Sequence, residues 1–431
     1  MKKIARRAFC VLLMAVMLLV GLGIFIREEY ENGRNWSLYF SAYNSESDGE
    51  IIDRNGKMLA YFSGTESTFC PDGATRVANY HLTGDDWNRT GTGLLSRYLD
   101  ASREYDFITG STLSTSTVMQ LGIDADWNTK AYELLKANGK GAIILCNYRT
   151  GEILCMVSTP SVDPLNSDPT AVEEGTYLNR CLSATFTPGS TFKLITSAAA
   201  IETIPDLYER TFLCEGKHYV AGVEIKCTST HGNQTFEEAL ANSCNCAFAQ
   251  IAVELGQNTI LEYAEKYGFL DSQQADGIPT VAGNFPREFV GDPETAWAGI
   301  GQSVDQVCPY AMMRYVSAIA NGGTVYEPHF IQSEEVQQTA LVSPTTARAL
   351  QKAMRNNVVT HYEGEVNFPG LNLCAKTGTA ELGNGMSHSW FTGFLQDEAH
   401  PYAFAAVVEQ GGYGLWTSGL MMNELLQYIV N

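Results

Sequence analysis

The chain has 431 residues, of which 45% are hydrophobic and 18% charged, which is typical of a globular protein large enough for two or three domains. Its 28 basic and 48 acidic side chains give a formal net charge of −20. A surface of that sign argues against a nucleic-acid partner, because phosphate binding needs the opposite charge.

The first predicted element is a membrane-spanning helix. Ala8 to Ile26 is apolar and uncharged, and about 19 helical residues span roughly 28 Å, close to the hydrocarbon thickness of a bilayer. Basic residues precede the run, so the positive-inside rule predicts a cytoplasmic tail at 1–7 and export of the rest. A cleaved signal peptide is the alternative. The run is longer than a usual signal-peptide core and no small-x-small site closes it, so we expect an uncleaved anchor at 8–26.

A small mixed module is expected at 27–137, in the position of a juxtamembrane pedestal or dimerisation-like domain. Residues 50–60 contain two short strand-like segments on either side of Asn55-Gly56. Two such segments joined by an Asn-Gly turn predict a β-hairpin. In the Ser/Thr-rich patch at 111–117, the side chains Leu113, Thr115 and Thr117 recur at every second position, which predicts an extended segment. A helix at 125–137 then leads into the main domain.

The main domain is expected at 138–431 and begins and ends with strands. A hairpin at 142–157 opens it, a helix-rich middle follows over 190–355, and strands return before a final helix. Within the middle, Asp292-Pro293 is read as an N-cap followed by proline at the first helical position. The later predicted elements are a helix at 310–320, strands at 371–379, 389–395 and 403–409, and a helix at 421–430. This order predicts an α+β fold in which helices flank an antiparallel five-stranded sheet and form a helical subdomain of their own.

Three short motifs carry the chemistry. They are Ser190-Thr191-Phe192-Lys193, Ser243-Cys244-Asn245 and Lys376-Thr377-Gly378, and each pattern occurs once, in this order. Ser-x-x-Lys at a helix start places a hydroxyl and an amine on one face. Alone that tetrad is a weak signal, but the two later motifs make it a strong one.

The residue types suit a serine nucleophile that works without histidine. Lys193 can take the proton of Ser190 if burial and a second cation lower its pKa, and Lys376 is the candidate for that cation. Ser243 would bridge the two amines and pass a proton to the leaving group. Asn245 can both donate to and accept from a peptide-like substrate.

The strand that carries Lys376 is expected to bind the substrate. Thr377 and Thr379, together with Lys376, would hold a carboxylate, and Gly378 would let the substrate lie against an edge strand. Backbone N–H groups of Ser190 and Thr379 would meet the oxyanion.

With their flanks, these motifs resemble the penicillin-binding proteins, in particular the monofunctional class B transpeptidases. The flanks are Asn179-Arg180, Thr187-Pro188-Gly189, Gly299-Ile300-Gly301-Gln302, Ala380-Glu381, His388 to Phe394 and, in the first module, Asp53-Arg54-Asn55-Gly56. The likeness is firm over 138–431 and loose over 48–124. The chain departs from the family pattern in two ways: Asp48-Gly49-Glu50 stands where the family often has Arg-Gly, and the first module is short for a pedestal or docking domain.

The resemblance implies a D,D-transpeptidase of peptidoglycan synthesis, embedded in the membrane and working without a cofactor. Ser190 would be acylated by the D-Ala-D-Ala end of a stem peptide, and the acyl group would pass to an amine on a neighbouring stem. β-Lactams would trap the same serine. A glycosyltransferase of the cell-wall machinery is the expected partner.

Other functions remain open at this point. A D,D-carboxypeptidase would pass the same acyl-enzyme to water. A class D-like β-lactamase or β-lactam sensor shares two of the motifs, although Asn245 stands where those proteins usually carry a hydrophobic residue. A non-catalytic scaffold of the division or elongation machinery would keep the fold for contacts alone.

For the other side chains in the flanks of the motifs we expect no catalytic role. His388 is expected to be structural, and Trp390 and Phe391 to belong to the core. Cysteines and a histidine gather around the second motif, at Cys214, Cys227, His231, Cys244 and Cys246. They permit three interpretations: free thiols, a disulfide (Cys214–Cys227, or Cys227 with Cys244 or Cys246), or a zinc site built from Cys214, Cys227, His231 and Cys244.

Overall fold

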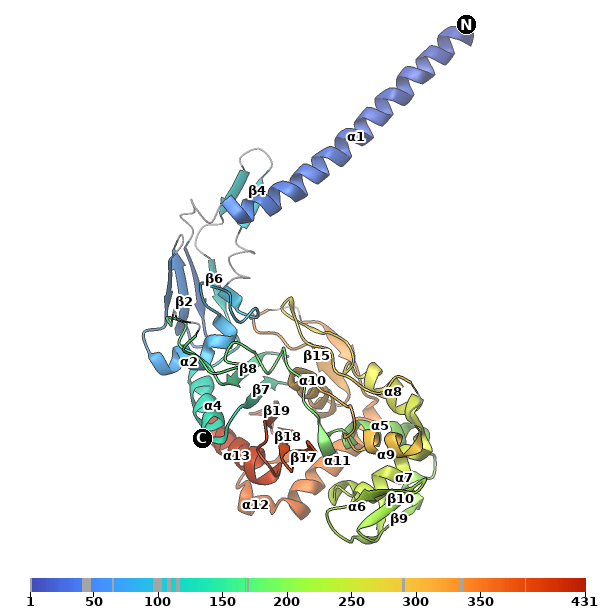
Figure 1. Ribbon diagram of the computed structural model, residues 1–431. Coiled ribbons are helices and arrows are strands. Elements are labelled where there is room, and N and C mark those ends of the chain that lie inside the picture. The colour runs from blue at the N-terminus through green and yellow to red at the C-terminus, as the bar shows by residue number, and fades with distance from the viewer. Residues whose placement is uncertain are drawn as a thin grey trace.

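The computed structural model describes residues 2–40, 48–63, 66–95, 103–106, 110–113, 117–166, 168, 170–288, 291–333, 336–383 and 385–431. A long helix leads into a small mixed module, and a larger domain follows (Figure 1).

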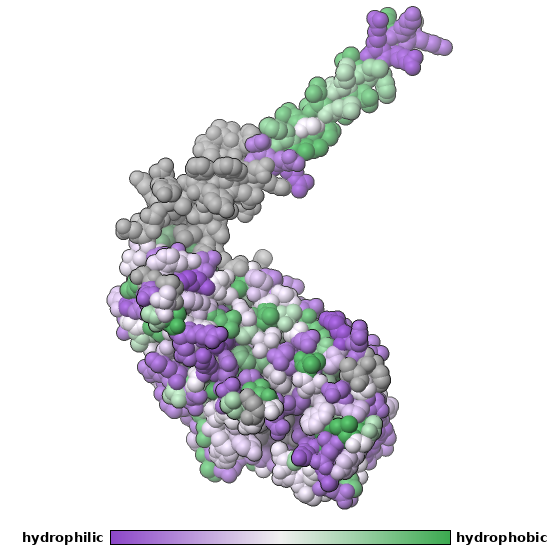
Figure 2. Space-filling model, in the orientation of Figure 1, coloured by the Kyte–Doolittle hydropathy of each residue, from purple (hydrophilic) through white to green (hydrophobic). Residues whose placement is uncertain are grey.

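The N-terminal helix α1 (Lys2–Phe40) projects away from the rest of the chain in Figure 1. Within its first part, Lys2–Tyr30, an 18-residue segment has a mean hydropathy of 3.0, and none of that segment is buried. Figure 2 shows a hydrophobic stretch along it between hydrophilic ends. By length and composition this helix could cross a membrane.

The small module contains the predicted hairpin. Strands β1 (Asp48–Ile52) and β2 (Met58–Ser63) pair antiparallel, and with β3 (Glu66–Phe69) and β6 (Thr117–Gln120) they form a sheet of order β3-β2-β1-β6. The Asp53 carboxylate accepts N–H bonds from Asn55 (2.9 Å) and Lys57 (2.7 Å), which fixes the turn. Of the extended segment predicted at 111–117, β5 (Gly110–Leu113) covers the start and β6 the last residue, whereas 114–116 lie outside the described residues.

The five-stranded antiparallel sheet of the large domain is confirmed. Its order is β17-β18-β19-β7-β8, so strands from the end of the chain pair with strands from the start of the domain. The strands are β7 (Gly141–Asn147), β8 (Ile153–Thr159), β17 (Leu373–Glu381), β18 (Ser387–Leu395) and β19 (Tyr402–Val408). Strand β17 is at an edge, as the substrate-binding hypothesis requires.

Both faces of this sheet are buried, so its strands are continuous apolar runs. Ile143 and Leu145 of β7 join a core with α4 (Ala125–Asn138) and α13 (Leu420–Val430), whereas Ile144 and Cys146 join a core with α10 (Pro309–Ala320). This alternation follows the two-residue period of a strand. Helices therefore cover the sheet on both sides (Figure 1).

The middle of the domain is helix-rich, as predicted, but it also contains short ladders that the helical pattern did not predict. Two of them, β9 (Thr211–Cys214) with β12 (Gly232–Thr235) and β10 (Lys217–Val220) with β11 (Val223–Lys226), stand beside α7 (Asn245–Leu255). Helix α9 (Asp292–Gly299) is capped by Gly291, so Asp292 is its first residue and not its cap. The other helices of this region are α5 (Lys193–Thr203), α6 (Phe236–Ala241), α8 (Gln257–Lys266), α11 (Pro344–His361) and α12 (Gly364–Asn367).

Candidate active site

Ser190 lies in a tight turn directly before a helix. Gly189–Thr191 forms a single 3-10 turn and α5 begins at Lys193, so the hydroxyl and the amine are one turn apart as predicted. Gly189 donates its N–H to Gly301 O (2.8 Å), and Phe192 closes the turn on Gly189 O (3.0 Å). The Ser190 side chain is half-buried.

Two glycines allow other segments to approach this turn closely. A Cβ on Gly301, which has a φ of +78°, would overlap the carbonyl oxygen of Gly189. A Cβ on Gly378 of β17 would lie 2.6 Å from the carbonyl oxygen of Pro188. The Ser190 turn is therefore packed between the Gly301 loop and the edge strand, with no room for side chains at those points.

Lys193 joins the first motif to the second. Its side chain is fully buried, and Nζ donates to Ser243 O (2.6 Å) and Asn245 Oδ1 (2.7 Å), with Ser243 Oγ at 3.4 Å. Among the described residues no hydrogen bond joins Ser190 to Lys193. Catalytic hydrogen bonds often shorten only when substrate binds, so this geometry is compatible with proton transfer from Ser190 to Lys193.

Lys376 joins the third motif to the same serine. Its buried Nζ donates to Ser243 Oγ (2.9 Å) and to Thr377 O (3.0 Å). Ser243 holds a φ of +51°, a left-handed conformation that is uncommon for a residue other than glycine. Such backbone strain concentrates at functional sites, and here it lets one residue present its carbonyl to one lysine and its hydroxyl to the other.

Burial lowers the pKa of both lysines. For Lys193 desolvation lowers the pKa to about 8, opposed by the nearby Cys227, Cys244 and Cys246. The pKa of Lys376 falls well below its ordinary value, first through desolvation and then through repulsion from Lys193. The effect of the second cation therefore falls on Lys376 and not, as expected, on Lys193. Two buried amines that share one serine cannot both carry a proton at low cost.

The edge strand presents its threonines on a different face from Lys376. The two-residue strand period places Thr377 and Thr379 together, and both are half-buried. Tyr362, at the end of α11, accepts the N–H of Thr377 (3.1 Å) and contacts its hydroxyl (3.1 Å). No sequence motif indicates Tyr362, because only the packing of α11 on β17 brings it there.

Four flank residues make contacts within the protein. Trp390 is fully buried and donates Nε1–H to Thr187 O (2.9 Å), and Phe391 is also buried. His388 is edge-on to Phe186, and its Nδ1 accepts the N–H of Gln410 (3.3 Å). Arg180 is paired with Glu409 at 2.6 Å. The bond from Trp390 holds the segment that leads into the Ser190 turn.

The cysteine cluster lies against the second motif. Cys214, Cys227, His231 and Cys244 offer ligand atoms that all lie within 4.8 Å of one another. The backbone N–H of Asn245 donates to Cys227 Sγ (3.3 Å). All of the chain's 11 cysteines lie in described segments, and none of them is in a disulfide there.

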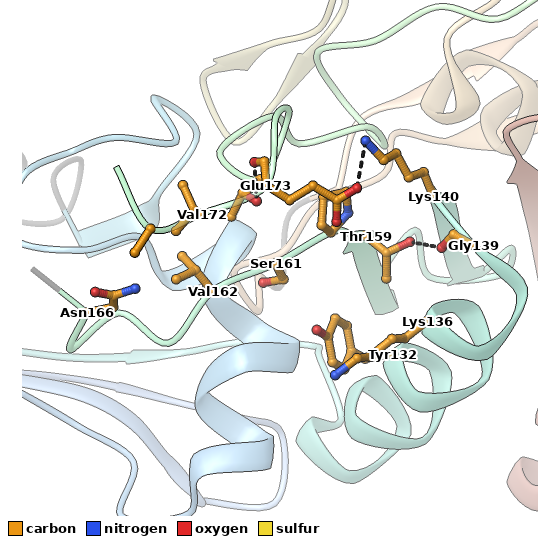
Figure 3. A pocket seen from close by; sticks show the side chains of 13 residues that line it. Tyr132, Lys136, Gly139, Lys140, Thr159, Ser161, Val162, Asn166, Val172 and Glu173 are labelled. Atoms are coloured by element: carbon orange, nitrogen blue, oxygen red, sulfur yellow. Dashed lines mark hydrogen bonds and ion pairs between the residues drawn. The ribbon is translucent and has the colours of Figure 1, made fainter. Parts of the chain in front are cut away.

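A separate hollow of about 400 Å³ lies between α4 and the segment after β8 (Figure 3). Its rim carries Lys136 and Lys140, and Lys140 is paired with Glu173 at 2.9 Å. None of the motif residues lines it. It is therefore not part of the site that contains Ser190.

Comparison with known proteins agrees with this geometry. The family described as "Penicillin binding protein transpeptidase domain" matches residues 141–427. "Peptidoglycan D,D-transpeptidase PbpA" of Mycolicibacterium smegmatis is 27% identical over 449 residues, which is 90% of this chain and 88% of that protein. "Stage V sporulation protein D" of Bacillus subtilis is 32% identical over 260 residues, which is 55% of this chain and only 39% of that relative.

Solved structures share the fold. Penicillin-binding protein A from M. tuberculosis, as a penicillin G acyl-enzyme complex, superposes with a TM-score of 0.74 at 22% identity, covering 90% of this chain and all of that one (100%). The family match covers more than half of the chain, so the chain belongs to the penicillin-binding proteins and carries their transpeptidase domain. Within them it is a class B member, as its motifs indicate.

Proposed function

We propose that this chain is a D,D-transpeptidase that cross-links peptidoglycan stem peptides through an acyl-enzyme on Ser190 and is acylated by β-lactams at the same atom. The observation that carries the proposal is the meeting of three distant motifs at Ser243, where Lys193 and Lys376 both bind. The relatives named as peptidoglycan D,D-transpeptidases support it.

In the first half-reaction Ser190 Oγ attacks the carbonyl carbon of the penultimate D-Ala. Lys193, as a free amine, takes the hydroxyl proton. The N–H groups of Ser190 and Thr379 hold the oxyanion. When the C–N bond breaks, Ser243 hands a proton from the lysine pair to the departing D-Ala amine, and an ester remains on Ser190.

In the second half-reaction an amine of a neighbouring stem peptide attacks that ester. The amine loses a proton to the lysine pair, the new amide forms as the ester C–O bond breaks, and the pair returns a proton to Ser190 Oγ. In the first half-reaction Asn245 would orient the backbone of the donor stem peptide, and Thr377 and Thr379 along Gly378 would hold the carboxylate of the terminal D-Ala until it departs. Each proton that Ser190, the leaving group or the acceptor amine gains or loses is exchanged with Lys193, Ser243 or Lys376.

Labelling with a fluorescent penicillin tests the assignment. We expect a stable adduct, located on Ser190 by peptide mass spectrometry and lost in Ser190→Ala, while Ser183→Ala, on the segment before the turn, keeps it. Absence of an adduct on Ser190 would refute the proposal. Rapid release of the adduct would indicate a β-lactamase, and trimmed but uncross-linked products from a stem-peptide substrate would indicate a carboxypeptidase.

We further propose the arrangement of the chain in the cell. Residues 1–7 would be cytoplasmic, 8–26 the membrane anchor, 27–137 a juxtamembrane module and 138–431 an extracytoplasmic transpeptidase domain that works beside a glycosyltransferase. The long apolar helix supports the anchor. Protease added to intact spheroplasts should digest the large domain and spare a tag placed before residue 8. Protection of the large domain from the protease would show that the chain has the opposite topology.

A further inference from the structure

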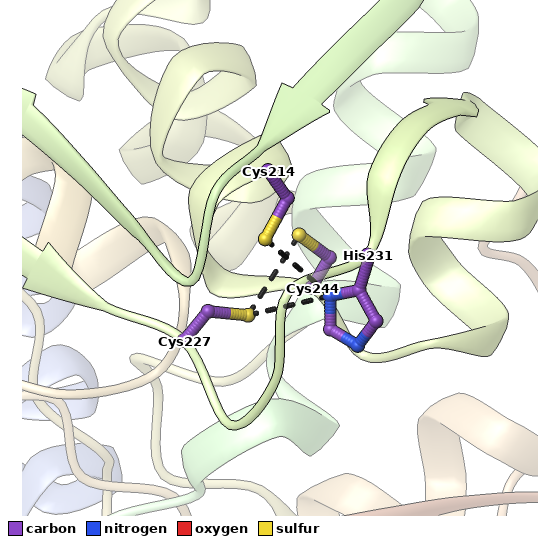
Figure 4. A group of neighbouring side chains, drawn as sticks. All are labelled: Cys214, Cys227, His231 and Cys244. Carbon is purple, nitrogen blue, oxygen red and sulfur yellow. Dashed lines mark hydrogen bonds between the residues drawn. The ribbon is translucent and has the colours of Figure 1, made fainter.

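A four-residue cluster beside the active site has the composition of a metal centre. Cys214 ends β9, Cys227 follows β11, His231 precedes β12, and Cys244 is the N-cap of α7. In Figure 4 the three sulfur atoms and the imidazole Nδ1 point toward a common centre. Two of these residues are buried and two are half-buried.

Three of the six distances between ligand atoms match the edges of a tetrahedron around a zinc ion, and all six are within 4.8 Å. Zn–S bonds of about 2.3 Å and Zn–N bonds of about 2.0 Å imply tetrahedral edges of about 3.8 Å between sulfurs and roughly 3.5 Å between sulfur and nitrogen. The Cys227 and Cys244 sulfurs are 3.8 Å apart. His231 Nδ1 lies 3.5 Å from Cys214 Sγ and 3.6 Å from Cys227 Sγ.

We propose that Cys214, Cys227, His231 and Cys244 bind one structural Zn²⁺ ion. Three thiolates and an imidazole form a soft, four-coordinate set that suits zinc and leaves no ligand position open. The ion would therefore take no part in the acyl transfer itself. This inference does not depend on the proposed transpeptidase activity.

Backbone groups already support two of the ligands. Asn245 N–H donates to Cys227 Sγ (3.3 Å) and Ala247 N–H donates to Cys244 Sγ (3.4 Å). Both N–H groups belong to the first turn of α7, where the helix dipole also favours a thiolate. Such hydrogen bonds orient metal ligands and hold them in the charged form.

The position of the cluster suggests a structural role for the ion. Cys244 stands between Ser243 and Asn245, the two residues that bind Lys193. The other ligands lie on or beside the two short ladders, β9–β12 and β10–β11, each of which has only four residue pairs. Zinc would tie these ladders to the start of α7 and so fix the second motif against Lys193.

Metal analysis of the full chain, purified in detergent without chelator, tests the proposal. We expect close to one zinc per chain by elemental mass spectrometry, and less than a tenth of that in Cys214→Ser, Cys227→Ser and His231→Ala. Cys374→Ser and His218→Ala, which remove the same groups elsewhere, should keep the metal. Ser190→Ala should also keep it, which separates this inference from the proposed function.

Two further measurements keep the test decisive if a ligand variant folds poorly. Cobalt exchanged into the wild-type chain should give the intense sulfur-to-metal absorption of a tetrahedral thiolate site. Chelation should slow penicillin acylation at least tenfold, and added zinc should restore it. Cys246, also in the first turn of α7, is expected to be dispensable, and loss of zinc in Cys246→Ser would overturn the ligand set.

The competing states of the cluster give opposite results. A disulfide such as Cys227–Cys244 would lower the intact mass by two hydrogens and leave no metal. Free thiols would react with a thiol reagent without releasing zinc. Either result on protein prepared under reducing, metal-replete conditions overturns the proposal.

Discussion

Ser243 binds two buried lysines through different atoms: its carbonyl oxygen accepts from Lys193 Nζ at 2.6 Å and its hydroxyl from Lys376 Nζ at 2.9 Å. The two ammonium groups would repel each other in a poorly solvated site, so the pair favours a state with one proton fewer. The pair of lysines can therefore supply a free amine to deprotonate Ser190, and no histidine is needed.

The acylation rate should rise with pH and level off near pH 8. Lys193 acts as a base only when deprotonated, and its pKa is lowered to about 8, so below that value each pH unit should cost about tenfold in rate. The measurement is the second-order rate of fluorescent-penicillin acylation between pH 6 and 9.5. A rate that stays flat across that range would contradict the role of Lys193.

The same pKa gives a stability prediction with a definite sign. The folded pKa of Lys193 lies below its ordinary value of 10.5, so the folded state disfavours the charged amine. The destabilisation is complete below about pH 8 and is lost as the pH rises toward 10.5. Relative to Lys193→Met, the wild-type chain should gain thermal stability over that interval.

Ser243→Ala should impair both chemistry and folding. It removes the hydroxyl that accepts from Lys376, so a buried amine loses a partner at a cost of about 1–3 kcal/mol, and the acylation rate should fall about 10²–10⁴-fold with loss of the proton path. Ser197→Ala is the matched control, because the buried Ser197 hydroxyl has no hydrogen-bond partner in the described structure. Denaturant unfolding and acylation kinetics report the two effects, and equal behaviour of both variants would contradict the role of Ser243.

Gly301→Ala should misplace the nucleophile. The added methyl group would overlap Gly189 O, and a shift of about 1 Å in a reacting group can cost roughly 10²-fold in rate. Gly322 also has a positive φ, +68°, but open space around its Cβ position. Gly322→Ala should therefore cost about 1–2 kcal/mol of stability and leave acylation intact. Similar acylation rates in the two variants would show that the close approach to Gly189 is unimportant.

Tyr362→Phe should loosen the edge strand. The Thr377 N–H would lose its acceptor, at a cost of about 1–3 kcal/mol, and Thr377 would be free to rotate away from the substrate side. We expect a higher penicillin concentration for half-maximal acylation, with a smaller change in the maximal rate. Tyr428→Phe, at an exposed tyrosine, should change neither quantity.

Several elements of this fold could be predicted because their signals are local. The Asn55-Gly56 hairpin, the paired strands at the start of the domain and the helix after Lys193 each depend on neighbouring residues. The short ladders around Cys214 and Cys227 could not be predicted, because they are brief, partly exposed and held by distant contacts. The cap of α9 was misplaced by one residue for a similar reason, since Gly291 supplies it through its conformation and not through a side chain.

The order and identity of the three motifs, together with the charge-free N-terminal run, predict a serine nucleophile, a lysine base and a membrane anchor, because such predictions depend only on residue type and short spacing. Only the tertiary structure determines which of these distant residues are in contact. It placed both lysines on Ser243, brought Tyr362 to Thr377, pressed Gly301 against Gly189 and gathered three cysteines with a histidine. Such contacts join segments far apart in the chain, and their geometry depends on how the helices and the sheet pack as a whole.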